Sequence, residues 1–284
     1  MTAGLFWGAS PVLVKRGLVH SNVSAATLYQ QATILAVLLG AALLEGDLFG
    51  GKIPPLAIAI FSVTGVVGAY LGRTLFVKSV AEIGASRAQS LNNSSPLFTV
   101  LLAALLLGER LTFAVLVGVA LIISGVLFVV RGETNGSGTL SRYTLTPASV
   151  LATLCYGIVP VLKKFGTDNG GPPVLGALVM HATGLVMLLT LGSLLKIELK
   201  WEKTATKSVM CFVAAGMLYA VGSIFTLKAL VVAPASVVAP IWSAQPIVSF
   251  FLAKATLRGI EEVTLKDGMA AALVVLGVLV LRWG

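Results

Sequence analysis

A polar stretch interrupts the apolar sequence between residues 86 and 96. It reads SRAQSLNNSSP, and Gln89, Asn92, Asn93 and Pro96 recur at i, i+3, i+4 and i+7. This spacing places the four residues on one face of a helix. Pro96 has no N–H to donate to the carbonyl of Asn92, so we expect a kink there. The face is predicted to line a cavity with neutral hydrogen-bonding groups. Hydrogen bonds that hold a helix bundle together are the alternative.

The composition places this stretch in a membrane protein. The chain has 284 residues, of which 57% are apolar and 11% charged, and its mean hydropathy is +0.98. Soluble domains carry ~25% charged residues, so a soluble enzyme and a disulfide-rich secreted module are excluded. The long apolar runs favour helices over a β-barrel. Lys and Arg flanking these runs explain the net charge of +9, and we expect no nucleic-acid partner.

Ten segments approach the ~20 helical residues needed to cross a bilayer. The connections between them are short, apart from a polar segment of Gly, Ser and Thr near the middle of the chain. The predicted fold class is therefore an all-α polytopic membrane protein with ten transmembrane helices. The ten segments are approximately 2–19, 25–45, 54–79, 84–107, 111–130, 147–166, 172–194, 207–231, 233–254 and 264–282.

The two halves of the sequence match each other. WGASPVLVKRG, beginning at Trp7, aligns with YGIVPVLKKFG, beginning at Tyr156, at an offset of 149. At an offset of 150, Gly72 pairs with Gly222 and Pro96 with Pro246, among others. Five spans per repeat is an odd number, so the second repeat must enter the membrane from the opposite side. The expected fold is a 5+5 inverted repeat about an axis in the membrane plane, which favours a transporter.

These motifs carry a family resemblance. The WG…K opening, the AS…P stretch from Ala85 and GERLT at residues 108–112 resemble the EamA-type family of the drug/metabolite transporter superfamily. The resemblance implies two EamA-like repeats, at 1–131 and 147–284, joined by a polar linker at 132–146. It also implies a central cavity lined by spans 1, 3, 4, 6, 8 and 9, and transport of small metabolites, often amino acids.

The repeat suggests further candidates for the cavity. Trp7 and Tyr156 occupy equivalent positions, and Trp242 and Gln245 are the equivalents of Asn92 and Ser95. One wall of the site would then be rich in amides and the other aromatic. The predicted substrate-binding residues are Trp7, Arg73, Gln89, Asn92, Asn93, Ser95, Tyr156, Trp242 and Gln245. Helix kinks are predicted at Pro11, Pro96, Pro160 and Pro246. Weaker candidates for the site are Tyr29, Gln30, Gln31 and His181.

The charges inside the spans limit the mechanism. Five cations lie in or near spans, namely Lys15, Arg73, Lys78, Lys164 and Lys228, while the span interiors almost lack Asp and Glu. The related small multidrug resistance proteins exchange protons for cationic drugs on a first-span Glu, and the first span here has none. We therefore predict a secondary transporter, an exporter or exchanger, for a small neutral, zwitterionic or anionic metabolite such as an amino acid. A multidrug exporter is the alternative.

Other functional classes fit the sequence less well. An integral-membrane enzyme would need a nucleophile, a metal cluster or paired carboxylates. The chain has two His and two Cys without metal-ligand spacing, so no enzyme activity, cofactor or metal is expected. A scaffold protein would not need an inverted repeat.

The location follows from the spans, but the orientation does not. We expect a multi-pass protein of the cell membrane with both termini on one side. The resemblance implies cytoplasmic termini, whereas most Lys and Arg lie on the opposite side, which contradicts the positive-inside rule. The patterns Gly4-xxx-Gly8 and Gly68-xxx-Gly72 predict close packing within the bundle, and a homodimer is the alternative.

Overall fold

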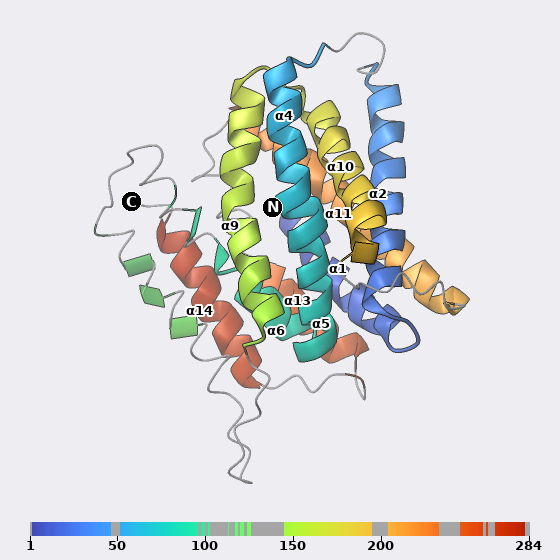
Figure 1. Cartoon of the computed structure of the whole chain (residues 1–284). Helices are drawn as coiled ribbons and strands as arrows, with labels where there is room; N and C mark the ends of the chain where they lie inside the picture. The colour runs from blue at the N-terminus through green and yellow to red at the C-terminus, as the bar shows by residue number, and fades with distance from the viewer. Residues whose placement is uncertain are drawn as a thin grey trace.

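The computed structural model describes most of the predicted helices (Figure 1). The fifth predicted span and the linker lie largely outside the described residues, and so does the first half of the ninth span, with Trp242. The described residues are 2–46, 52–95, 145–194, 204–232, 245–257, 260 and 265–281, with the separate positions 98, 99, 102, 113, 117, 118, 120, 121, 124 and 125.

Apart from the fourth, fifth and ninth spans, which are described only in part, the described helices agree with the predicted spans to within about four residues. The first half of the chain contains α1 (Thr2–Leu18), α2 (Val23–Leu44), α4 (Pro55–Thr64), η1 (Gly65–Gly72), α5 (Arg73–Ile83) and α6 (Ala85–Asn92). The second half contains α9 (Pro147–Asp168), α10 (Pro173–Leu194), α11 (Thr206–Val232), α13 (Gln245–Thr256) and α14 (Leu265–Leu281).

Five of the described helical stretches are long and apolar enough to cross a membrane. They are Val23–Leu44, Pro55–Ile83, Pro147–Asp168, Pro173–Leu191 and Thr206–Ala229. Their length and hydropathy, together with the composition of the whole chain, define an all-helical integral membrane protein that crosses the bilayer several times.

Local sequence signals set several helix boundaries. Asn22 caps α2 by accepting a hydrogen bond from the N–H of Ala25 at 2.8 Å. Thr146 and Ser149 form a capping box at the start of α9. Gly84, with φ of 90°, lies between α5 and α6, where a residue with a side chain would be strained.

The third and fourth spans differ from the regular helices predicted. The third span continues from α4 to α5, but Gly65–Gly72 is π-helical, and π segments often mark functional sites. In the fourth span, α6 ends at Asn92, and Asn93 and Ser94 form a turn before the chain is helical again at Ser95. The expected kink at Pro96 itself lies outside the described residues.

The two halves pack against each other through equivalent contacts. Helix α1 lies along α11, and α9 lies along α4 and α5. Gly17 in α1 faces the ring of Phe212 in α11, and Gly166 in α9 faces the ring of Phe61 in α4. Gly17 and Gly166 are 149 residues apart, and the two Phe are 151 apart. The absence of a Cβ at each glycine therefore permits the same close approach twice.

A second pair of contacts repeats in the same way. The Ser249 hydroxyl donates to the carbonyl of Gly8, and the Thr99 hydroxyl donates to the carbonyl of Gly157 at 2.7 Å. Donors and acceptors correspond at offsets of 150 and 149. Each hydrogen bond joins one half of the chain to the other, so the sequence repeat is also a repeat of packing.

Helices α2 and α10 pack against each other and run in opposite directions. Ala42, near the end of α2, packs with Val174 and Leu175, at the start of α10. Figure 1 shows that α2 ends and α4 begins at the end of the bundle where α9 passes into α10. Each of α2 and α10 is the second helix of its half.

The glycines of the small-xxx-small pattern in the third span have partners within the bundle. A Cβ on Gly68 would meet Val159, and one on Gly72 would meet Cys155, both in α9. Gly68 and Gly72 therefore act in the intramolecular packing that their spacing predicts.

This packing predicts that Gly65→Ala destabilises the protein while Gly40→Ala does not. A Cβ on Gly65 would overlap the backbone oxygen of Met180 and lie 2.9 Å from the Cβ of Thr183, whereas nothing lies within 4 Å of a Cβ on Gly40. Overpacking costs ~1–3 kcal/mol. Thermal unfolding of the purified variants in detergent measures the difference. Equal melting temperatures would contradict the packing of the third span against α10.

Candidate functional site

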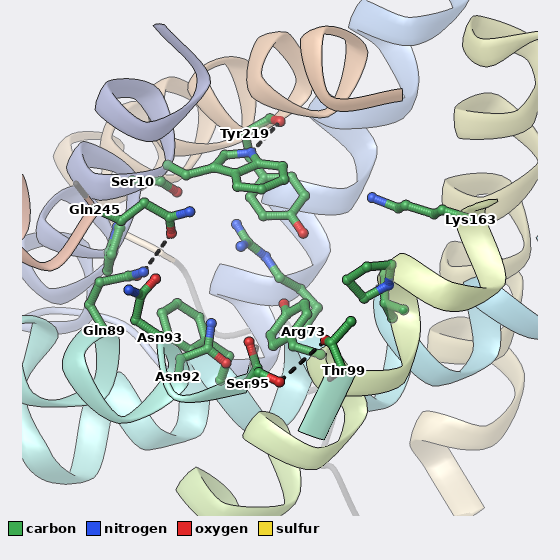
Figure 2. A pocket seen from close by; sticks show the side chains of 16 residues that line it. Ser10, Arg73, Gln89, Asn92, Asn93, Ser95, Thr99, Lys163, Tyr219 and Gln245 are labelled. Atoms are coloured by element: carbon green, nitrogen blue, oxygen red, sulfur yellow. Dashed lines mark hydrogen bonds between the residues drawn. The ribbon is translucent and has the colours of Figure 1, made fainter. Parts of the chain in front are cut away.

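A cavity lies where six spans of the two halves meet. Its lining comes from α1, α5, α6 and the turn after it, α9, α11 and α13, which are the six spans that the resemblance implies. Its volume is about 90 Å³, which at ~10–15 Å³ per water is room for roughly half a dozen waters or a small solute. The lining residues, shown in Figure 2, are Trp7, Ser10, Pro11, Arg73, Phe76, Gln89, Asn92, Asn93, Ser95, Thr99, Tyr156, Val159, Pro160, Lys163, Tyr219 and Gln245.

The structure brings together all but one of the residues predicted to bind substrate. Trp242 lies outside the described residues. Pro11 and Pro160 line the cavity too, within α1 and α9. Pro246 belongs to α13. That a solute binds these residues stays a prediction. The predicted substrate-binding residues that line the cavity are Trp7, Arg73, Gln89, Asn92, Asn93, Ser95, Tyr156 and Gln245.

Aromatic rings and a guanidinium form a stack on one side of the cavity. The rings of Trp7 and Tyr219 lie 5.5 Å apart and nearly parallel, and the Trp7 indole donates to the carbonyl of Tyr219 at 3.1 Å. The Cζ of Arg73 lies 4.1 Å from the centre of the Tyr219 ring. The stack fixes the charge over the face of an aromatic ring, where the quadrupole attracts it.

Arg73 is a buried cation whose hydrogen bonds are only partly satisfied. Its side chain is 3% exposed, its Nη2 donates to Oε1 of Gln30, and its Nε has no hydrogen-bond partner. The described lining contains no Asp or Glu. A buried charge without a counter-charge is costly, so the guanidinium is available to a polar or anionic solute.

Lys163 adds a second cation to the same cavity. It is 4% exposed, and its Nζ lies 5.9 Å from the centre of the Trp7 ring. Figure 2 shows its side chain reaching into the cavity from the side opposite Gln89 and Gln245. The described ion pairs of the chain leave both Arg73 and Lys163 without a carboxylate.

An amide-rich wall faces these cations (Figure 2). Gln89 donates through Nε2 to Oε1 of Gln245 at 2.6 Å, which joins α6 to α13. Oδ1 of Asn92 and Nδ2 of Asn93 are buried without a partner. The oxygen and nitrogen of an amide are assigned from such networks, so the two Asn can present either group. Buried polar atoms normally have partners, and this concentration of unsatisfied atoms indicates a place for a polar ligand.

Sequence reasoning missed Lys163 and Tyr219. Lys163 follows Tyr156 by seven residues and Pro160 by three, and this helical spacing could have placed it on the cavity face. Its repeat equivalent is Val14, so the alignment of the two halves gives no signal. Tyr219 faces the same difficulty, because its equivalent at an offset of 150 is an alanine.

Of the five cations singled out in the sequence, only Arg73 lines the cavity. Lys78 and Lys228 are about half exposed near helix ends and pair with Glu82 and Glu45. Lys15 donates to the carbonyl of Ala81, and Lys164 pairs with Asp168. The depth of Arg73 in its span therefore distinguishes it from cations that serve helix ends.

The polar candidates in the second and seventh spans support the site from outside. His181 Nδ1 lies 3.0 Å from Oε1 of Gln31, and Gln31 donates to the carbonyl of Ala69 in the π segment. Gln30 holds Arg73. None of Gln30, Gln31 and His181 is in the described cavity lining, so these side chains position helices and the guanidinium.

The fold and the cavity together define a class of protein. Two matching halves, packed around a cavity with unsatisfied polar groups, form the arrangement of membrane transporters that carry solutes. The family comparison agrees, since the EamA-like transporter family model matches residues 1–131 and 147–283. The chain belongs to the EamA-like transporter family. It is a secondary transporter of the drug/metabolite superfamily, with a small-molecule substrate, and this is a family of transporters and not of enzymes.

Two further comparisons define the limits of the likeness. The search of curated proteins found no match. A crystal structure of a protein 18% identical to this chain superposes with a TM-score of 0.66, covering 98% of this chain and 94% of the other. At this identity the likeness shows the fold alone.

The unsatisfied amide of Asn92 leads to a prediction. Asn92→Ala should weaken the apparent affinity for the transported solute about 5- to 150-fold, because losing a buried polar partner costs ~1–3 kcal/mol. Initial transport rates against solute concentration, in proteoliposomes with equal amounts of folded protein, measure it. Leu276→Ala, at a 52% exposed position of α14, is the control. Unchanged affinity in both variants would assign Asn92 to helix packing.

Proposed function

We propose that this transporter carries a small neutral, zwitterionic or anionic metabolite, such as an amino acid, through the described cavity. It would work as an exporter or exchanger by alternating access. The observation that carries this proposal is the cavity itself, which combines partnerless polar atoms of Arg73, Asn92 and Asn93 with aromatic side chains. Mixed linings of this kind bind small solutes with a polar head and an apolar body.

We further infer ten spans in a 5+5 inverted repeat, with repeats at 1–131 and 147–284 joined by the linker 132–146. The equivalent glycine contacts, the opposite directions of α2 and α10 and the cavity between the halves support this arrangement. Two halves related by such an axis supply two states of similar energy that open to opposite faces. We place the protein in the cell membrane with both termini in the cytoplasm, as the resemblance implies.

Export of cationic drugs has less support. The described lining holds two cations and no carboxylate, so a cationic drug would enter a cavity of its own charge. Repulsion between charges is strong where little water screens it. The proton exchange that a first-span Glu performs in small multidrug resistance proteins has no equivalent group in α1.

A counterflow screen tests the proposed function. Purified protein in proteoliposomes loaded with one unlabelled solute should concentrate the labelled form when the solute is an amino acid or another small metabolite. The panel includes sugars and organic anions, and liposomes without protein are the control. Quaternary ammonium compounds should not move when a proton gradient is imposed. Robust proton-coupled export of such compounds would overturn the proposal.

The inverted repeat predicts opposite accessibility for two equivalent residues. His20 follows α1 and Asn169 follows α9, 149 residues later, and both are exposed. Single cysteines at these positions, in a background without Cys155 and Cys211, should react with a membrane-impermeant maleimide from opposite faces of oriented membrane vesicles. Labelling of both from one face would show parallel repeats and contradict the proposed topology.

A further inference from the structure

We propose that the cavity selects solutes of net negative charge, namely small organic acids with one carboxylate, an apolar body and no ammonium group. This inference rests on the proposed function and narrows it, because it separates an organic anion from a zwitterionic amino acid of the same shape. The residues that set the charge preference are Arg73 and Lys163.

The first step of the argument is the charge balance of the cavity. Arg73 and Lys163 are 3% and 4% exposed, so water compensates neither charge well. The described lining offers no carboxylate, and the described Asp and Glu that form ion pairs do so with other cations. The missing counter-charge is therefore one that the solute can bring.

The second step is the geometry around the guanidinium. Gln30 occupies the Nη2 group of Arg73, and the ring of Tyr219 covers one face at 4.1 Å. The Nε has no partner, so its N–H is free to donate a charge-assisted hydrogen bond to a carboxylate. In Figure 2 the guanidinium points into the cavity from beneath Tyr219, toward Gln245 and Asn93.

The third step is the lack of a place for an ammonium group. The acceptors on the wall are amide and hydroxyl oxygens, and Asn92 Oδ1 is one of the few without a partner. An ammonium held there would share a small cavity with Lys163 and Arg73, with no negative charge in the described lining to offset their repulsion. A hydroxyl group at the same position would accept from Asn93 and donate to Asn92 without that cost.

The aromatic and aliphatic residues of the lining determine which apolar body the solute can have. Trp7 and Tyr219 contribute stacked aromatic rings to the lining, and Phe76 and Val159 extend the apolar surface. This apolar surface suits a compact apolar body such as an isobutyl or phenyl group. The predicted class is thus a 2-hydroxy or simple monocarboxylic acid with one such group.

Matched isosteres test the charge preference directly. For the isobutyl body the set is 2-hydroxy-4-methylpentanoate, leucine, 2-hydroxy-4-methylpentanamide and leucinamide, which are anion, zwitterion, neutral molecule and cation. The phenyl set is 3-phenyllactate, phenylalanine and the two corresponding amides. Binding is measured by calorimetry on the purified protein in detergent, and transport by counterflow in proteoliposomes.

We expect the hydroxy acid of at least one set to bind about tenfold or more tightly than its amino acid, and to exchange faster. Equal or tighter binding of the amino acid or the neutral amide would overturn the charge preference while leaving the proposed transport function intact. Failure of both hydroxy acids to bind or exchange would also overturn it. Absence of counterflow for every solute of the wider screen, whatever its charge, would instead count against the proposed function.

Charge-removing variants assign the preference to the two cations. Arg73→Gln and Lys163→Gln should each weaken binding of the hydroxy acid by about 10- to 100-fold, while Lys163→Arg should retain most of it. Lys78→Gln and Lys164→Gln remove one positive charge from the same helices outside the cavity and should leave binding unchanged. Equal losses in all four neutral variants would show a general effect of surface charge and contradict the assignment.

A variant with a changed solute preference separates a role in binding from a loss of folding, because a misfolded protein would not gain affinity for any solute. Lys163→Glu should bind leucine or phenylalanine more tightly relative to the hydroxy acid, because a carboxylate now faces the ammonium. Melting temperatures establish that each variant is folded before its affinities are compared. An unchanged ratio of affinities in a folded Lys163→Glu protein would contradict the role of Lys163.

Discussion

The buried guanidinium of Arg73 is the constraint on which the rest of the site depends. A permanent charge within a membrane helix is stable only if neighbouring groups compensate for lost hydration. Gln30 supplies an acceptor from α2, and Tyr219 supplies a ring face from α11. Tyr219 in turn stacks on Trp7 of α1. Three helices of the bundle thus hold one charge at the cavity wall.

Close packing between helices allows these aromatic side chains to reach their positions. Gly222 faces the indole of Trp7, and any Cβ there would occupy the space of its Nε1. Gly72 is the equivalent residue of the first half. A Cβ added to it would lie 3.7 Å from the ring of Tyr156. Of this pair, a Cβ is therefore excluded by an aromatic ring only at Gly222, whereas at Gly72 the closest side-chain neighbour is Cys155 at 3.1 Å.

Much of this could be predicted from sequence because two independent periodicities were visible. The helical period placed Gln89, Asn92 and Asn93 on one face, and the offset of 149–150 paired the halves. Both signals weaken where the repeat is broken. In the alignment of the halves, Lys163 pairs with Val14, so the repeat does not single it out. Its neighbour Lys164 pairs with Lys15, and both of these are cations near helix ends. The sequence also did not predict the π segment. Its equivalent in α11 is ordinary α-helix, so the repeat gives no indication of it.

Both cations of the cavity lie at positions where the two halves differ. The contacts that join the halves recur faithfully, as Ser249 with Gly8 and Thr99 with Gly157 show. The two cations do not recur, since Arg73 and Lys163 correspond to Ser223 and Val14. In the proposed mechanism, a symmetric scaffold would allow two states of similar energy, and an asymmetric lining would give the solute one preferred orientation in both. Under alternating access, the solute would then stay bound to the same charges while the surrounding helices move and the cavity opens to the other side of the membrane.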